Sequence, residues 1–99
     1  MTANFKTPPF VSQALRQFAR GQDCQMKSLW CNGDRETTVL CHNRRRAGAG
    51  YGQKPHDFWG YHGCSDCHAN EGSLEDRELS DAIRRTQYLV YAHFGTLTP

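Results

Sequence analysis

Residues 64–68 read Cys64-Ser65-Asp66-Cys67-His68, and an earlier pair of cysteines, Cys24 and Cys31, precedes them in the chain. Two thiolates separated by two residues lie on one tight turn and reach the same tetrahedral metal ion. A second cysteine pair, separated from the first by 32 residues, closes such a site and joins two distant segments. The pattern predicts a structural zinc site of four thiolates, with no open coordination position.

Three other interpretations of these cysteines remain open at this point. The six-residue gap between Cys24 and Cys31 is wider than the usual spacing of zinc ligands, so disulfide bonds and unliganded thiols are alternatives. Residues 64–68 also match the Cys-x-x-Cys-His pattern of c-type haem attachment. Haem attachment would require export and would leave Cys24 and Cys31 without a role, so zinc is preferred.

The size of the chain supports a need for such a metal. Its 99 residues and 11.3 kDa allow one domain and exclude a large multi-site enzyme. The apolar share is 37%, below the roughly 45–50% of globular chains, and small domains of this kind usually need a metal, a disulfide or a partner chain. We expect residues 1–10 to form a flexible arm and 11–99 a single domain.

The sequence also predicts the cellular setting. The longest apolar runs are far below the roughly 18 residues that a membrane span needs. Residues 1–10 lack the apolar segment of a secretory signal. We therefore expect a cytoplasmic protein with no membrane partner, whose cysteine pairs bind metal rather than form disulfides.

Hydrophobic periodicity predicts a mixed α+β order of elements. Apolar positions with helical spacing predict a helix over 11–20 that ends at Gly21, and a second helical face runs from Leu79 to Gly95. That second helix has two candidate starts, Ser73 with Asp76 or Ser80. Segments 37–42 and 57–62 predict short strands, and 43–52 is a basic, glycine-rich loop.

Two histidines and a cluster of basic residues point to phosphate chemistry. His42 ends the first predicted strand and His68 follows the second knuckle, so we expect the zinc site to bring them near each other. A neutral imidazole activates water as a general base, and a second one holds a divalent metal against a phosphate. Residues 1–54 carry a formal charge of +6 and residues 55–99 a charge of −4. The cations expected to contact phosphate oxygens are Arg44, Arg45, Arg46 and Lys54.

Together these features resemble a known family. The Cys-x6-Cys-Asn-Gly segment, residues 36–40 with His42, the glycine loop, Lys54-Pro55 with Asp57, and the final Cys-x2-Cys-His are similar to the Ref/YbcO-type recombination-enhancement nucleases of phages and prophages. Those nucleases are relatives of the zinc-containing HNH, or ββα-metal, endonucleases. The resemblance covers about residues 18–94. It implies a small zinc-stapled ββα-metal (HNH, His-Me finger) domain with flanking N- and C-terminal helices.

The resemblance also implies roles for particular residues. His42 matches the general base at the end of the first strand, and His68 matches the metal ligand on the helix. No asparagine lies at the position expected from the HNH pattern, and Asp57, seven residues before Cys64, stands in as a metal ligand or as an orienter of His42. Cys41, which precedes the base, is a soft thiol poorly suited to Mg²⁺.

The function implied is that of an endonuclease that cleaves DNA with Mg²⁺ or Mn²⁺ during recombination or repair. The resemblance further implies co-operation with a recombinase filament on single-stranded DNA. Two alternatives stay open: a non-catalytic zinc-stabilised nucleic-acid-binding module, and a protein-interaction module that uses the acidic C-terminal half. Only catalysis requires both His42 and His68.

Overall fold

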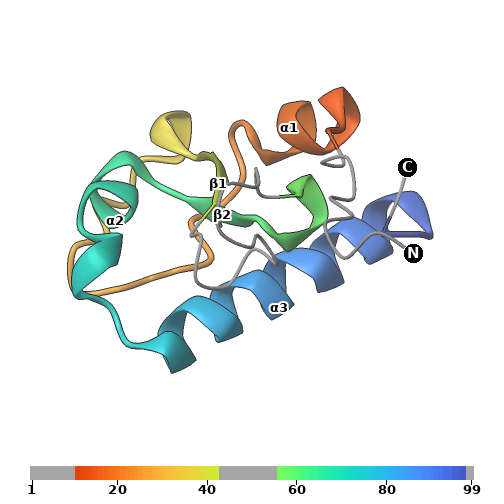
Figure 1. The fold of residues 1–99 in the computed structure, drawn as a ribbon. Helices are drawn as coiled ribbons and strands as arrows, with labels where there is room; N and C mark the ends of the chain where they lie inside the picture. Colours follow the sequence, from red (N-terminus) through yellow and green to blue (C-terminus); the bar gives the residue numbers. More distant parts are fainter. Residues whose placement is uncertain (1–10, 43–55, 98–99) are drawn as a thin grey trace, which may run out of the picture.

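The computed structural model describes residues 11–42 and 56–97. Within them the elements are α1 (Gln13–Ala19), β1 (Val39–Cys41), β2 (Tyr61–Gly63), α2 (Ser65–Ala69) and α3 (Asp76–Phe94), with three 3-10 turns, η1 (Arg35–Thr37), η2 (Asp57–Trp59) and η3 (Glu71–Ser73). Figure 1 shows the two strands at the centre, α3 running beneath them, and α1 and α2 at opposite ends. The predicted α+β class is confirmed for this part of the chain.

Helix α1 confirms the first predicted helix with slightly narrower bounds. Ser12 is its N-cap, and the hydroxyl of Ser12 accepts a hydrogen bond from the backbone N–H of Leu15. Leu15 and Ala19 form its buried face. The helix ends before Gly21, whose φ of 78° suits a residue without a Cβ.

The sheet is shorter than the predicted strands. β1 and β2 pair in antiparallel fashion, with Val39 opposite Gly63 and Cys41 opposite Tyr61. Thr37 closes a 3-10 turn instead of extending β1, because its backbone N–H donates to the carbonyl of Asp34. The strand predicted over 57–62 begins only at Tyr61, since residues 57–59 form η2 and direct the Asp57 side chain inward.

Helix α3 presents the predicted face to the core. The buried positions are Leu79, Ala82, Ile83, Thr86 and Val90, and the helix ends at Gly95 in a left-handed conformation. Its start differs from both expectations: Glu75 and Glu78 make the capping box. Leu74 is buried and extended, and Ser73 belongs to η3, so the chain turns before the helix begins.

The core lies between α3 and one side of the sheet and reaches the cysteines. Tyr61, Cys64 and Cys67 are fully buried beside Leu79 and Ile83. Gly60 allows the strands to approach closely, because a Cβ there would lie 2.9 Å from the backbone oxygen of Cys41. Over the described ranges, none of the helices combines the length and apolar character needed to cross a bilayer.

Candidate metal centre and active site

The sulfur atoms of Cys24, Cys31, Cys64 and Cys67 all lie within 4.8 Å of one another. Cys24 and Cys67 are 3.7 Å apart at their sulfurs, and Cys31 and Cys64 are 4.0 Å apart. A tetrahedral zinc ion with Zn–S bonds of about 2.3 Å separates its sulfur ligands by about 3.8 Å. All five cysteines are free thiols. The predicted four-cysteine set therefore fits one metal ion and is not paired in disulfides.

Hydrogen bonds and burial shift the pKa values of Cys64 and Cys67 in opposite directions. Cys64 is the N-cap of α2, and its sulfur accepts a hydrogen bond from the backbone N–H of Cys67. Burial works to raise the pKa of Cys64, but backbone N–H groups of Asn32 and Cys67 lower it to about 7. Burial raises the pKa of Cys67 to about 12, although hydrogen bonding with Ser28, whose hydroxyl lies 3.1 Å from the Cys67 sulfur, works to lower it. A bound cation would hold both thiolates ionised.

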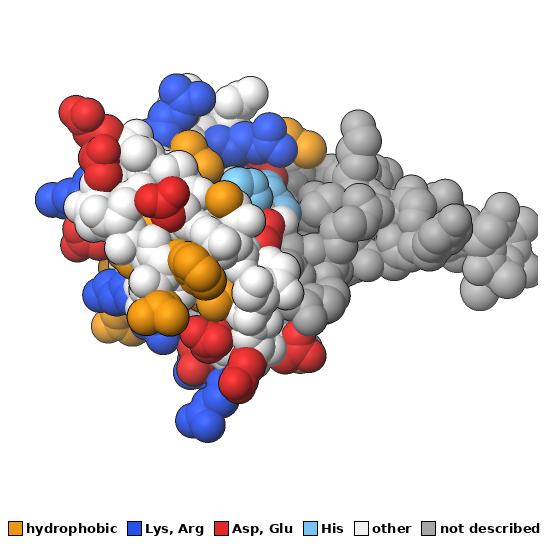
Figure 2. Space-filling model, turned by 90° about the vertical axis from the view of Figure 1, so that its left-hand side faces the viewer, with side chains coloured by type: hydrophobic (Ala, Val, Ile, Leu, Met, Phe, Trp, Pro, Cys, Tyr) orange, Lys and Arg blue, Asp and Glu red, His pale blue; other side chains and the backbone are white. Residues whose placement is uncertain are grey.

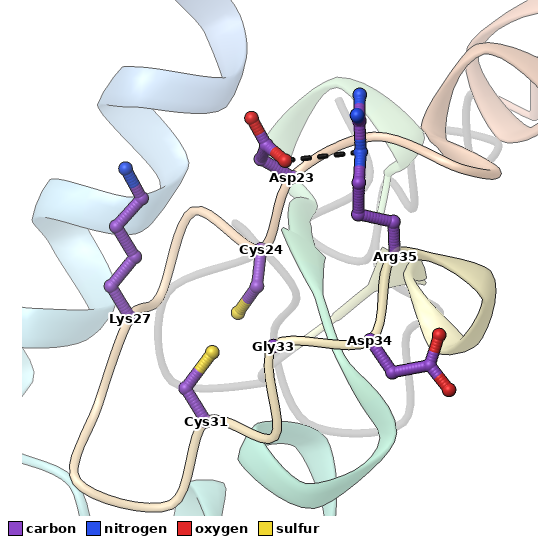
Figure 3. Close-up of a pocket in the computed structure, with 7 residues that line it drawn as sticks. All are labelled: Asp23, Cys24, Lys27, Cys31, Gly33, Asp34 and Arg35. Carbon is purple, nitrogen blue, oxygen red and sulfur yellow. Dashed lines mark ion pairs between the residues drawn. The ribbon is translucent and has the colours of Figure 1, made fainter.

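The metal centre opens to solvent on one side. A cavity of about 280 Å³ is lined by Cys24, Cys31 and residues around them, and Figure 3 shows the two sulfurs pointing toward one another. Asp23 and Arg35 form an ion pair of 3.1 Å at its rim. The cavity is thus the outer face of the cysteine cluster.

The buried carboxylate of Asp57 organises a second cluster at the other end of the sheet. Its Oδ2 accepts from the backbone N–H of Ser12 at 2.7 Å and from Nε of Arg16 at 2.9 Å. Its Oδ1 accepts from Nη2 of Arg16 at 3.1 Å and from Nε2 of His42 at 2.9 Å. Burial works to raise the pKa of Asp57, but the bonds from Arg16 and Ser12 outweigh it and lower the pKa.

This arrangement decides which ring nitrogen of His42 is available. Because an ionised carboxylate only accepts hydrogen bonds, Nε2 of His42 is protonated and donates the hydrogen bond that Asp57 accepts. In the neutral ring, Nδ1 then has the lone pair. His42 is about one-fifth exposed, so the ring can meet a substrate at the surface. The structure brings together His42 and Asp57, the proposed base and its orienter.

His68 lies in a different place, on the exposed side of α2. Its Nδ1 lies 3.1 Å from Oε1 of Glu71, and the other oxygen of Glu71 accepts from the hydroxyl of Tyr61 at 2.8 Å. His42 follows Cys41, which pairs with Tyr61 at the start of β2, whereas His68 belongs to α2, which follows the end of β2. In the described structure each histidine contacts a different carboxylate, His42 with Asp57 and His68 with Glu71.

Cys41, beside the proposed base, is excluded from both clusters. Its side chain is buried and donates weakly to the carbonyls of Val39 and Gly63, each at 3.6 Å. Burial raises its pKa to about 12, so the thiol stays protonated at neutral pH. Cys41 is therefore a packing residue in this structure.

Some functional candidates were missed by the sequence, and others lie outside the described residues. Arg44, Arg45, Arg46 and Lys54 belong to residues 43–55, which the structure does not describe. Arg16 and Glu71 emerged only from the fold, as partners of Asp57 and His68. The polar position of Arg16 on an amphipathic helix gave no signal, because such positions are ordinarily solvated.

Taken together, fold and site define a small α+β domain in which four cysteines are placed to hold a metal ion. The chain belongs to the family described as "Putative nuclease YbcO", whose model matches residues 13–93. The resemblance to YbcO-type proteins seen in the sequence is thereby confirmed at the level of the family.

Individual relatives agree with the family assignment. Proteins named "Putative nuclease YbcO" from Escherichia coli strain K12 and "Putative nuclease ybcO" from Enterobacteria phage 82 are each 46% identical over 55 residues. Those matches cover 54% of this chain and 57% of each relative, so they span just over half of the relatives' length. A solved structure of a "putative bacteriophage protein" from Escherichia coli K-12 MG1655 superposes with a TM-score of 0.60 at 28% identity, covering 79% of this chain and 96% of that one.

Proposed function

We propose that this chain is a metal-dependent DNA endonuclease of the HNH type, with β1, β2 and α2 as its ββα-metal core. The observation that carries the proposal is the pair formed by His42 and Asp57 at the end of β1. A histidine oriented by a buried carboxylate is the usual arrangement of a general base. The name "nuclease" borne by the family indicates the bond that such a base would help to break.

The proposed chemistry at His42 follows from its hydrogen bonds. Nδ1 takes a proton from the attacking water, while Nε2 keeps its proton and donates a hydrogen bond to Asp57, whose negative charge stabilises the imidazolium that forms. Assistance of this kind is worth roughly 10²–10⁴-fold in rate. Asp57 is then a positioning residue, since protein donors occupy both of its oxygens and it does not fit as a metal ligand.

Two metals have separate places in this proposal. Zinc at the four cysteines is structural, because four thiolates fill its coordination sphere. We assign the catalytic Mg²⁺ or Mn²⁺ to His68, with the adjacent Glu71 as a second candidate ligand. When bound, such a cation would neutralise negative charge on the phosphate. The proposed biological setting is phage-type recombination or repair, with a recombinase filament on single-stranded DNA as partner.

One observation favours a second candidate function, a non-catalytic zinc-stabilised nucleic-acid-binding module. His42 and His68 contact different carboxylates toward opposite ends of the sheet. Among residues 11–42 and 56–97, the cysteine set is the only group of three or more side chains arranged to hold a metal. A base and a metal ligand that do not converge on one phosphate would bind DNA without cutting it.

Cleavage of plasmid and oligonucleotide DNA across a titration of Mg²⁺ and Mn²⁺ separates the two functions. We expect His42→Ala to lower the rate by roughly 10²–10⁴-fold at every metal concentration. His68→Ala should raise the metal concentration needed as well as lower the rate. Both variants should keep the zinc content and melting temperature of the wild type. A wild-type protein that binds DNA and never cuts it would establish the binding module instead.

A further inference from the structure

A surface cleft of about 270 Å³ opens beside the proposed base, between α1 and β1. It is lined by Arg16, Arg20, Val39, Leu40 and His42. Arg16 lies in the last turn of α1 and Arg20, four residues later, is the C-cap of that helix, and both side chains line the cleft. The cleft therefore joins two guanidinium groups from one element to a histidine from another.

The charge of this cleft is positive even though Asp57 lies behind it. The Asp57 side chain is fully buried and its oxygens face donors from Ser12, Arg16 and His42. Arg20 is exposed, and within the described part of the chain it has no carboxylate partner. Figure 2 shows Lys and Arg side chains next to histidine at the upper edge of the described surface. An anion entering the cleft meets an uncompensated guanidinium.

Arg16 retains donors that the ion pair does not use. A guanidinium has five N–H donors. Asp57 takes one from Nε and one from Nη2, which leaves Nη1 unengaged by that carboxylate. Arg16 can thus donate from Nε and Nη2 to Asp57 and from Nη1 to a bound anion. Arg16 would then connect the anion to the Asp57–His42 pair. Planar guanidinium groups match phosphate oxygens well in this manner.

We propose that this cleft is a binding subsite for a backbone phosphate of DNA. Arg20 supplies the main attraction, Arg16 bridges the phosphate to Asp57, and His42 faces the same space. Val39, which is 43% exposed, and Leu40 provide an apolar wall suited to the adjacent sugar. The subsite rests on DNA being the ligand, as in the proposed function, but it does not require cleavage. It adds α1 to a DNA surface that the sequence had placed in the 44–54 loop alone.

Equilibrium binding of a fluorescently labelled duplex, measured by anisotropy over a range of salt without added divalent metal, tests the subsite. We expect Arg20→Ala to weaken binding about three- to tenfold and to reduce the slope of log K against log salt by about one. Arg20→Lys should keep most of the slope because it keeps the charge. Arg77→Ala on α3 is the control, since it removes the same charge from an exposed residue on another element.

The outcomes separate the subsite from the nuclease. If Arg20→Ala and Arg77→Ala bind alike, with melting temperatures equal to the wild type, the subsite is wrong whatever the protein cleaves. If Arg20→Ala alone loses affinity and salt dependence while no metal supports cleavage, the subsite stands and the nuclease proposal fails. Inorganic phosphate added at fixed ionic strength should not displace the duplex; displacement at low millimolar phosphate would show a site for the free anion and overturn the assignment to DNA.

Discussion

Nε2 of His42 lies 2.9 Å from Oδ1 of Asp57, a buried carboxylate that also binds Arg16 and the backbone N–H of Ser12. This single contact fixes the tautomer of the proposed base and connects α1, β1 and η2. Because protein donors surround both oxygens of Asp57, we propose that it positions His42 rather than binds a metal.

The cysteine cluster predicts one zinc ion per chain. Cys64→Ser should lose the metal and cooperative unfolding, because structural zinc in small domains contributes about 10–16 kcal/mol of apparent binding free energy at neutral pH. Cys41→Ser is the matched control and should retain full zinc content, since Cys41 lies outside the cluster. Elemental analysis of the reduced, folded protein together with thermal unfolding measures both. Metal-free wild type that still unfolds cooperatively would contradict the structural role.

Arg16 is predicted to stabilise the fold through Asp57. Arg16→Ala should cost about 1–3 kcal/mol in the free energy of unfolding, less than a fully buried pair because the Arg16 side chain is 46% exposed. Arg84→Ala, which removes the exposed ion pair with Asp81, should cost under about 1 kcal/mol. Urea unfolding at neutral pH gives both values, and equal losses would refute a special role for Arg16.

Asp57 also predicts a particular pH dependence. Its pKa is lower in the folded protein than its ordinary value of 3.8, so the folded state binds fewer protons there. The stabilisation is present above the unfolded pKa and disappears as pH falls through the lower, folded pKa. Asp57→Asn should be less stable than wild type at pH 7 and the difference should shrink below about pH 4. A difference independent of pH would contradict the charge-based explanation.

The burial of His62 is expected to make the folded protein less stable in mild acid. It is fully buried with neither ring nitrogen hydrogen-bonded, and burial lowers its pKa from 6.5 to about 4. The unfolded state therefore binds more protons between those values, and stability falls by up to about 3 kcal/mol as pH drops from about 6.5 to 4. His62→Phe should flatten this loss, because phenylalanine has no proton to gain. Zinc content must be measured at each pH, and equal pH profiles at equal zinc content would refute the prediction.

The basic residues between 44 and 46, which lie outside the described structure, are predicted from the sequence to bind DNA. Replacing Arg44, Arg45 and Arg46 with Ala should weaken DNA binding about equally across sequences and lower the salt slope by about two to three. Phosphate contacts position the protein without reading bases, so specificity should not change. Anisotropy titrations on duplexes of unrelated sequence measure this. An unchanged salt slope would show that the DNA surface lies elsewhere, with the α1 cleft as the next region to test.

The sequence by itself determined the features carried by residues that are neighbours along the chain. Cysteine spacing predicted the metal-binding set because two ligands on one turn are fixed by local geometry. The apolar positions from Leu79 to Val90 predicted the buried face of α3 because helical periodicity is a local property. The same motifs pointed to the YbcO-type family, which the match over residues 13–93 confirms.

Contacts between side chains that are far apart in the sequence could be identified only from the folded structure. Asp57 contacts Arg16 and Ser12 across separations of 41 and 45 residues, and no sequence period encodes such pairs. The same packing shortened both strands and placed His68 with Glu71 rather than with His42. A buried carboxylate needs hydrogen-bond donors, because leaving its charge unpaired in the core would cost several kcal/mol. Those donors can come from segments that are distant in the sequence. The pairing of Asp57 with Arg16 and His42 therefore orients the proposed base, and both partners also line the cleft between α1 and β1.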